Sequence, residues 1–143
     1  MSISFSQGGP SGRPLVLLAM AAVLLLGGCA TTQQRGYELE TAQRAYLRAA
    51  RWGDWAVLRS FHRSLDADAV ALMHEQSRNL RMSAYTVLEG NADLENGTAW
   101  QVVEFGYYRV DSNIERHVVD KQSWVYDQDR SVWFVDSPFP RLD

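Results

Sequence analysis

Cysteine is nearly absent from this sequence, since Cys29 is the only one among 143 residues. A single cysteine cannot form a disulfide within the chain, and it cannot build a zinc site from several thiolates. If Cys29 is itself modified, no thiol remains to act as a catalytic nucleophile. Disulfide scaffolds and thiolate metal centres are therefore excluded, and with a modified Cys29 so are cysteine-dependent enzymes.

The chain also lacks an apolar run long enough to cross a bilayer. Leu15–Leu26 has no charged or polar side chain, but about 12 helical residues reach only about 18 Å, against a hydrocarbon core about 30 Å thick. The run follows a polar leader, Met1–Arg13, that carries one positive charge and no acid. This layout, with glycines at its end, is typical of a cleaved secretory signal.

Positive charge is scarce as well. The whole chain has a net charge of −3, and residues 1–28 hold one basic residue and no acidic one, which leaves −4 on the remainder. A mildly acidic domain suits neither the phosphates of nucleic acids nor the anionic surface of a bilayer. We therefore expect no nucleic-acid partner and no attachment to lipid through surface charge.

The segment Leu26-Gly27-Gly28-Cys29 resembles the lipobox of bacterial lipoproteins, an aliphatic residue and two small residues before a cysteine. The resemblance implies a thioether-linked diacylglycerol on Cys29, cleavage after Gly28, and a further acyl chain such as palmitate on the new amino terminus. Two or three acyl chains hold a protein firmly on a membrane, whereas one binds marginally. The alternative is that Cys29 ends an ordinary signal peptide or becomes a buried thiol.

This interpretation divides the chain into a signal peptide (residues 1–28), a lipidated tether (29–35) and a single α+β domain (36–143). The polar tether after the cysteine spans at most about 20 Å when extended, so the domain should lie close to its leaflet. Ala30 follows the cysteine, and the lipoprotein resemblance implies that a residue other than aspartate there directs the protein to the outer membrane. We predict attachment to the periplasmic face of the outer membrane in a bacterial cell envelope.

The first half of the domain has helical spacing of its apolar residues. Residues three and four apart predict a helix over Tyr37–Arg51. Gly53-Asp54 predicts the end of that helix and the N-cap of the next, which runs from Trp55 to about His62. After an interruption at Ser64–Asp68, a third helix is expected from Ala69 to just before Arg81.

The second half is predicted to consist of strands, because it is rich in β-branched and aromatic residues. The expected strands are Met82–Glu89, Thr98–Val110, Ile114–Tyr126 and Val132–Asp136. The expected turns are Gly90–Gly97, which contains Gly90-Asn91 and Asn96-Gly97, then Asp111-Ser112-Asn113 and Asp127–Arg130. Helices followed by antiparallel strands predict an α+β fold, with N-terminal helices packed on one face of a curved antiparallel sheet of about four strands.

This order of elements, with the patterns Ala-Arg-Trp-Gly-Asp-Trp and Ser-Val-Trp-Phe-Val-Asp, resembles the nuclear transport factor 2-like superfamily over residues 36–137. Within it, the chain is similar to small bacterial lipoproteins of unknown function, and a cystatin-like arrangement is a near neighbour. The resemblance implies a cone-shaped fold, a pocket between the helices and the concave side of the sheet, and frequent dimerisation through the sheet. Some relatives are ketosteroid isomerases or polyketide cyclases with a pocket carboxylate, and many others only bind ligands or proteins.

The three histidines do not suggest a metal site. His74-Glu75 is followed by Gln-Ser-Arg, so no second histidine lies one helical turn further on. His62 and Asp66 are four residues apart, but the predicted helix ends between them. We expect His62, His74 and His117 at the surface or rim of the fold, and neither a metal nor a dissociable cofactor.

Two acids within the predicted strands, Glu104 and Asp120, are the candidates for catalysis. If either points into the pocket, burial raises its pKa and makes it a candidate general base. A two-residue Ser112-Asn113 turn would instead pair Glu104 with Lys121 as a cross-strand ion pair.

A three-residue turn would shift that register by one residue and place Trp100 opposite Trp124. Neither long strand alternates cleanly between apolar and polar residues, as a sheet with one wet face would. The second face therefore either contacts a subunit, a partner or the membrane, or its aromatic side chains simply cover the sheet. The candidate binding residues are Trp100, Tyr107, Trp124 and Tyr126.

The sequence thus predicts a non-catalytic envelope lipoprotein that binds a partner protein or a small apolar ligand, the partner being an envelope protein or a second copy bound through the sheet. One alternative is an envelope enzyme of the ketosteroid isomerase or polyketide cyclase type that uses a pocket carboxylate. Another is a structural role in an envelope assembly.

The lipid assignment predicts the behaviour of Cys29→Ser. Without the thiol no diacylglycerol can be attached, so acyl labelling should be lost and the precursor should stay uncleaved. Metabolic labelling with a fatty acid and the electrophoretic mobility of the protein measure both. Normal processing of the mutant would instead indicate an ordinary signal peptidase.

Overall fold

The computed structural model describes the backbone of residues 13–142 and the side chains of residues 31–142. Cys29 and the cleavage site after Gly28 lie outside the residues with described side chains, so lipidation stays a prediction. The chain divides into two units, residues 1–34 and residues 35–143, and every contact given below lies within the second. Among the described residues, no helix is both long and apolar enough to cross a membrane.

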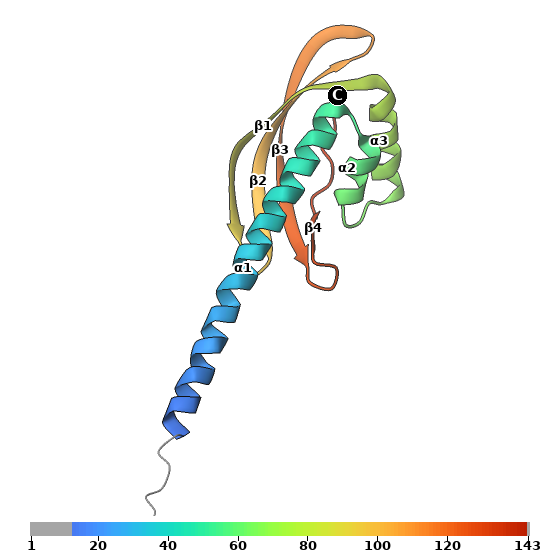
Figure 1. The fold of residues 1–143 in the computed structure, drawn as a ribbon. Helices are drawn as coiled ribbons and strands as arrows, with labels where there is room; N and C mark the ends of the chain where they lie inside the picture. Colours follow the sequence, from blue (N-terminus) through green and yellow to red (C-terminus); the bar gives the residue numbers. More distant parts are fainter. Residues whose placement is uncertain (1–12, 143) are drawn as a thin grey trace, which may run out of the picture. The chain divides into compact units, whose positions relative to one another are not determined.

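In the described part of the chain, helices come first and strands follow (Figure 1). The elements are α1 (Arg13–Trp52), α2 (Trp55–Phe61), α3 (Ala67–Asn79), β1 (Leu80–Asp93), β2 (Thr98–Arg109), β3 (Ser112–Asp127) and β4 (Val132–Val135). The strands form one antiparallel sheet in the order β1-β2-β3-β4. Buried residues of all three helices share one core with the sheet, which confirms the predicted α+β class.

The breaks between helices follow the predicted chemistry. Gly53 ends α1 with a positive φ of 66°, a conformation that glycine adopts without strain. Asp54 then caps α2 by accepting a hydrogen bond from the Val57 amide at 3.1 Å. Asp66 caps α3 through the Ala69 amide at 2.7 Å. Because of that cap, α3 begins at Ala67, two residues earlier than predicted.

The first helix also begins earlier than the predicted Tyr37, since α1 starts at Arg13. Pro14 lies in its first turn, where the missing amide costs no helical hydrogen bond. Further along, Arg35 is bound into the domain. Its guanidinium donates to the carbonyls of Leu94 and Glu95 at 3.1 Å each, and its own carbonyl accepts from the indole of Trp133 at 3.1 Å. The last residue of the predicted tether is therefore held by the sheet.

The turn predicted at Gly90-Asn91 is wrong, because β1 continues through it to Asp93. Gly90 lies opposite Gln101 in the ladder. A Cβ at Gly90 would lie 2.9 Å from the carbonyl oxygen of Trp100. The glycine therefore allows β1 and β2 to approach closely and does not form a turn. The chain turns instead around Asn96-Gly97, where Gly97 has a φ of 67°.

The hairpin between β2 and β3 differs from both predicted alternatives. Arg109 lies opposite Ser112, so the loop is Val110-Asp111. Two hydrogen bonds from the Arg109 guanidinium to the Asp111 carboxylate, at 3.1 and 3.2 Å, hold this tight loop. An irregularity next to Arg109 then takes up two residues of β3, because Tyr108 already lies opposite Glu115.

The loop and the irregularity together set a register that matches neither prediction. Glu104 lies opposite Val119 and not Lys121, and Trp100 lies opposite Ser123 and not Trp124. Directly opposed residues point to the same face of an antiparallel sheet. The pairs therefore decide which side chains lie under the helices and which face away from them.

Tyr46 of α1 lies at the centre of the core. Its side chain is fully buried, and its ring meets those of Phe61, Tyr85 and Trp124 edge-to-face, with centroids 5.6, 6.4 and 5.7 Å away. Edge-to-face pairs contribute about 0.5–1.5 kcal/mol each beyond the burial of their area. Tyr46 thus joins α1 and α2 to the sheet.

The core predicts unequal costs for two neighbouring substitutions in α2. Leu58→Ala should lower the free energy of unfolding by about 2–5 kcal/mol, because it empties a fully buried site. Val57→Ala, at a side chain that is 39% exposed, should change it by no more than about 0.5 kcal/mol. Chemical denaturation of both variants measures the difference, and equal effects would contradict this packing of α2.

Candidate functional site

The sheet face under the helices is filled with side chains. Val103, Phe105 and Trp124 have no exposed surface there, and Tyr107 is 5% exposed. Two of the predicted binding residues, Tyr107 and Trp124, therefore belong to the core. A third, Tyr126, is half-buried at its edge, where the Arg35 guanidinium lies 5.0 Å from its ring centroid.

A polar network crosses this otherwise apolar core. The Gln101 amide donates to Gln122 Oε1 at 2.7 Å and to the Tyr85 hydroxyl at 3.2 Å, and that hydroxyl donates to the same Gln122 oxygen at 3.2 Å. Buried polar groups of this kind are stabilised only when they are paired. Burial raises the pKa of Tyr85 although its bond to Gln122 acts in the opposite direction.

Asp120, one of the two candidate catalytic acids, lies next to this network. It stands opposite Val103, and so on the helix side of the sheet. Burial raises the pKa of its carboxyl, and the side chain of Gln122 partly offsets that effect. The other candidate, Glu104, lies opposite Val119 on the far side. The two acids therefore cannot act on one substrate.

His62 is buried, which corrects its predicted surface position. It is 7% exposed, its Nδ1 lies 3.1 Å from the Ser137 carbonyl oxygen, and its Nε2 lies 3.4 Å from the Tyr46 hydroxyl. His74 and His117 are exposed, as predicted, and His117 Nδ1 lies 3.5 Å from Glu104 Oε1. The side chains described include no group of three His, Cys, Asp or Glu that could hold a metal.

The opposite face of the sheet, which we call the outer face, is open to solvent and partly apolar. Val119 is 59% exposed in the middle of β3, and Trp100, Val102 and Tyr108 are half-buried along β2. The outer-face residues of these two strands are Trp100, Val102, Glu104, Tyr108, His117, Val119, Lys121, Ser123 and Val125. Apolar side chains grouped on an exposed sheet face form a candidate binding surface.

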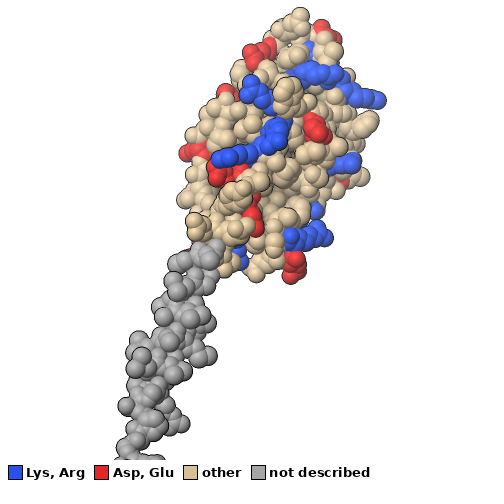
Figure 2. Space-filling view, viewed as in Figure 1, with Lys and Arg blue, Asp and Glu red and all other residues tan. Residues whose placement is uncertain are grey.

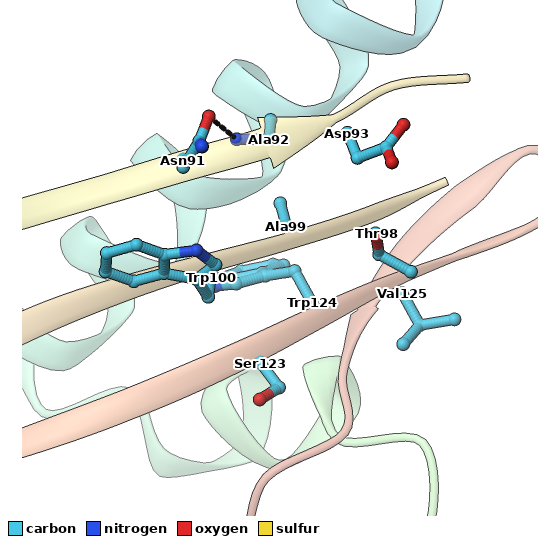
Figure 3. A pocket seen from close by; sticks show the side chains of 9 residues that line it. All are labelled: Asn91, Ala92, Asp93, Thr98, Ala99, Trp100, Ser123, Trp124 and Val125. Atoms are coloured by element: carbon cyan, nitrogen blue, oxygen red, sulfur yellow. Dashed lines mark hydrogen bonds between the residues drawn. The ribbon is translucent and has the colours of Figure 1, made fainter. Parts of the chain in front are cut away.

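A hollow of about 370 Å³ lies at one end of this face, where β1, β2 and β3 run side by side (Figure 3). We call it the Trp100 hollow. Its lining residues are Asn91, Ala92, Asp93, Thr98, Ala99, Trp100, Ser123, Trp124 and Val125. Figure 3 shows the Trp100 indole in front of the strands and the Trp124 ring behind them. Only Trp100 among the predicted binding residues offers its ring to this hollow.

The polar lining of the hollow was missed by sequence reasoning. Asn91 and Asp93 lie in the segment for which the sequence predicts a turn, since asparagine and aspartate are common turn residues. Their residue types therefore do not indicate a binding site. The Asn91 side-chain oxygen accepts from the Ala92 amide at 2.8 Å (Figure 3). Nothing in the sequence marks Thr98 and Ser123 as site residues, because the role of a hydroxyl in a strand depends on its neighbours on the adjacent strands.

A second hollow lies between α1 and the start of β4. It has about 330 Å³ and is lined by Tyr37, Glu38, Thr41, Ala42, Ala45, Phe61, Ser131, Val132 and Trp133. Most of these side chains are apolar, and Tyr37 is 68% exposed. Elsewhere on the molecule, basic and acidic side chains are interspersed over the face shown in Figure 2, so that face has no field of one sign.

Comparison with known proteins supports the fold alone. No protein-family model matches the chain, and no curated protein matches it. One solved structure is similar, a conserved protein from Planctomyces limnophilus DSM 3776, with 13% sequence identity and a TM-score of 0.53. The match covers 73% of this chain and 97% of that one.

The buried His62 predicts a loss of stability in acid. Burial lowers its pKa from the ordinary 6.5, although the Ser137 carbonyl acts to raise it. The unfolded chain therefore binds a proton near pH 6.5, whereas the folded protein does so only at lower pH. Stability is full above pH 6.5 and falls as the pH drops toward the folded pKa, by no more than about 1.4 kcal/mol per pH unit for one proton.

Chemical denaturation at pH 7.5 and pH 5.5 measures this loss. His62→Gln, which keeps an N–H donor, should lose less stability than the unmodified protein over that interval. His74→Gln, at an exposed position of α3, should behave like the unmodified protein. Equal losses in all three would show that His62 does not carry the effect.

Proposed function

We propose that this protein is a lipid-anchored, non-catalytic binding protein of the bacterial cell envelope, attached at the periplasmic face of the outer membrane through Cys29. Its outer face binds a partner protein. The observation that carries the proposal is the exposed apolar surface along β2 and β3, with Val119 at 59% exposure in its middle. The lipobox resemblance supplies the location, and the short tether keeps the domain near the membrane.

The contrast between the two faces supports binding over catalysis. The helix side is packed around Tyr46, Phe105 and Trp124, which have no exposed surface, whereas the outer face is open to solvent. The outer face is broad, because β2 and β3 pair over nearly their whole length. Aromatic residues set among aliphatic ones are enriched at the centres of protein interfaces.

The enzyme alternative has one observation in its favour. Asp120 is a partly buried acid whose pKa is raised by burial, and it lies near Tyr85 and Tyr46, where burial raises the pKa of both hydroxyls and the Asp120 charge adds to that effect. A carboxylate base beside tyrosine hydroxyls is the arrangement expected for proton transfer next to a carbonyl. Binding of a steroid or polyketide analogue that Asp120→Asn abolishes would favour this alternative.

Crosslinking in native membranes tests the proposed function. Val119→Asp places a charge in the middle of the outer face. A bound partner would bury this charge without a pairing group, so capture of the crosslinked partner should weaken at least tenfold. Val57→Asp, at a 39% exposed position of α2, is the matched control and should leave capture unchanged. Both variants should remain folded, because both positions are exposed.

The identity of the crosslinked product separates the remaining alternatives. A product with a different envelope protein supports the proposal directly. A product made only of two copies of this chain would identify the sheet as a homodimer interface instead. Undiminished capture by Val119→Asp would show that the outer face is not the binding surface.

A further inference from the structure

The Trp100 hollow has a fixed negative charge at one end. Asp93 is the one charged side chain that lines it. The Asp93 carboxylate accepts from the Asn96 backbone amide at 3.1 Å and from the Asn96 side-chain amide at 2.7 Å. These bonds lower the pKa of Asp93, which keeps the carboxylate ionised at neutral pH.

The Trp100 ring already attracts a cation from beside the hollow. The ammonium of Lys121 lies 5.4 Å from the centroid of the Trp100 ring, within the range at which an indole face stabilises positive charge. Lys121 is exposed, so its contact with the ring is open to competition. An indole and a carboxylate in one hollow therefore form a site for a positively charged group.

The spacing of these two groups suits a long cationic side chain. Asn91 lies opposite Trp100 and Asp93 lies opposite Thr98, so Trp100 and Asp93 lie on neighbouring strands with their Cα positions offset by two residues, about 6.6 Å along the strand direction. Ser123 and Thr98 add hydroxyl oxygens to the lining. A side chain that reaches the carboxylate lays its methylene groups over the indole on the way.

We propose that the Trp100 hollow receives an arginine side chain of the partner protein, whose guanidinium binds the Asp93 carboxylate while its stem lies on the Trp100 ring. The inference rests on the proposed function, since it names the chemistry by which the outer face recognises its partner. Arginine fits better than lysine because its planar guanidinium stacks on aromatic faces. It also offers five donors to the acceptors that line the hollow.

The test uses the full-length lipoprotein in a non-ionic detergent with N-acetylarginine amide as the probe. N-acetylcitrulline amide, which has nearly the same shape and no charge, is the matched control. The Trp100 indole N–H signal in nuclear magnetic resonance spectra should shift with the arginine probe and stay in place with the citrulline probe. The signal of Trp52, which is 81% exposed, should not move with either.

Asp93→Asn sharpens the test, because asparagine keeps an oxygen to accept the Asn96 amide and so preserves the turn. This variant should weaken binding of the arginine probe at least fivefold, whereas Asp129→Asn, at an exposed acid in the turn between β3 and β4, should leave it unchanged. Equal shifts with citrulline, equal affinity for N-acetyllysine amide, or unchanged affinity of Asp93→Asn would each overturn the assignment to arginine.

Failure of this inference can be distinguished from failure of the proposed function. If the arginine probe fails while Val119→Asp still abolishes crosslinking, the outer face binds its partner without this anchor and only the present inference is lost. If the probe binds as expected while crosslinking is indifferent to Val119→Asp, the hollow is a cation site and the proposed function is lost.

Discussion

Burial of the Tyr46 ring against Trp124 is the contact on which the rest of this structure depends. Tyr46 has no exposed surface and touches aromatic rings from α2, β1 and β3. Once Trp124 points toward the helices, strand alternation sends its neighbours Ser123 and Val125 to the other side. Because Trp100 in β2 lies opposite Ser123, its side chain also points away from the helices. One aromatic contact thus decides which side chains of the sheet face the helices and which face solvent.

This arrangement has a chemical consequence, because it places the two candidate acids on opposite faces of the sheet. Asp120 lies beside the buried Gln101–Gln122–Tyr85 network, whereas Glu104 lies on the outer face near His117. The interior is stabilised by packed rings and by the hydrogen bonds that Gln122 Oε1 accepts from Gln101 and Tyr85. What stays open is an outer face with apolar residues in its middle and an indole beside a carboxylate at its end. We propose that this open face recognises another protein.

Much of the fold could be predicted from the sequence, because local chemistry determines it. The Gly53-Asp54 break, the α+β order and the Asn96-Gly97 turn follow from residues acting on their neighbours. The register could not be predicted, because the choice of Val110-Asp111 as the loop depends on the Arg109–Asp111 pairing and on an irregularity further along β3. Gly90 is predicted to form a turn because its actual role, close approach to the Trp100 backbone, depends on the neighbouring strand. For the same reason the Trp100 hollow was found in part: its aromatic residue was identified and its polar lining was not.

Hydroxyl-radical footprinting of intact envelopes tests the central claim, that the outer face is covered by a partner in the cell. Oxidation of Trp100 in the purified protein is compared with its oxidation in the envelope, and Trp52 serves as an exposed reference. If a partner covers the outer face, Trp100 should be oxidised several-fold less in the envelope, while Trp52 should be oxidised equally in both. Equal oxidation of Trp100 in the two preparations would contradict it.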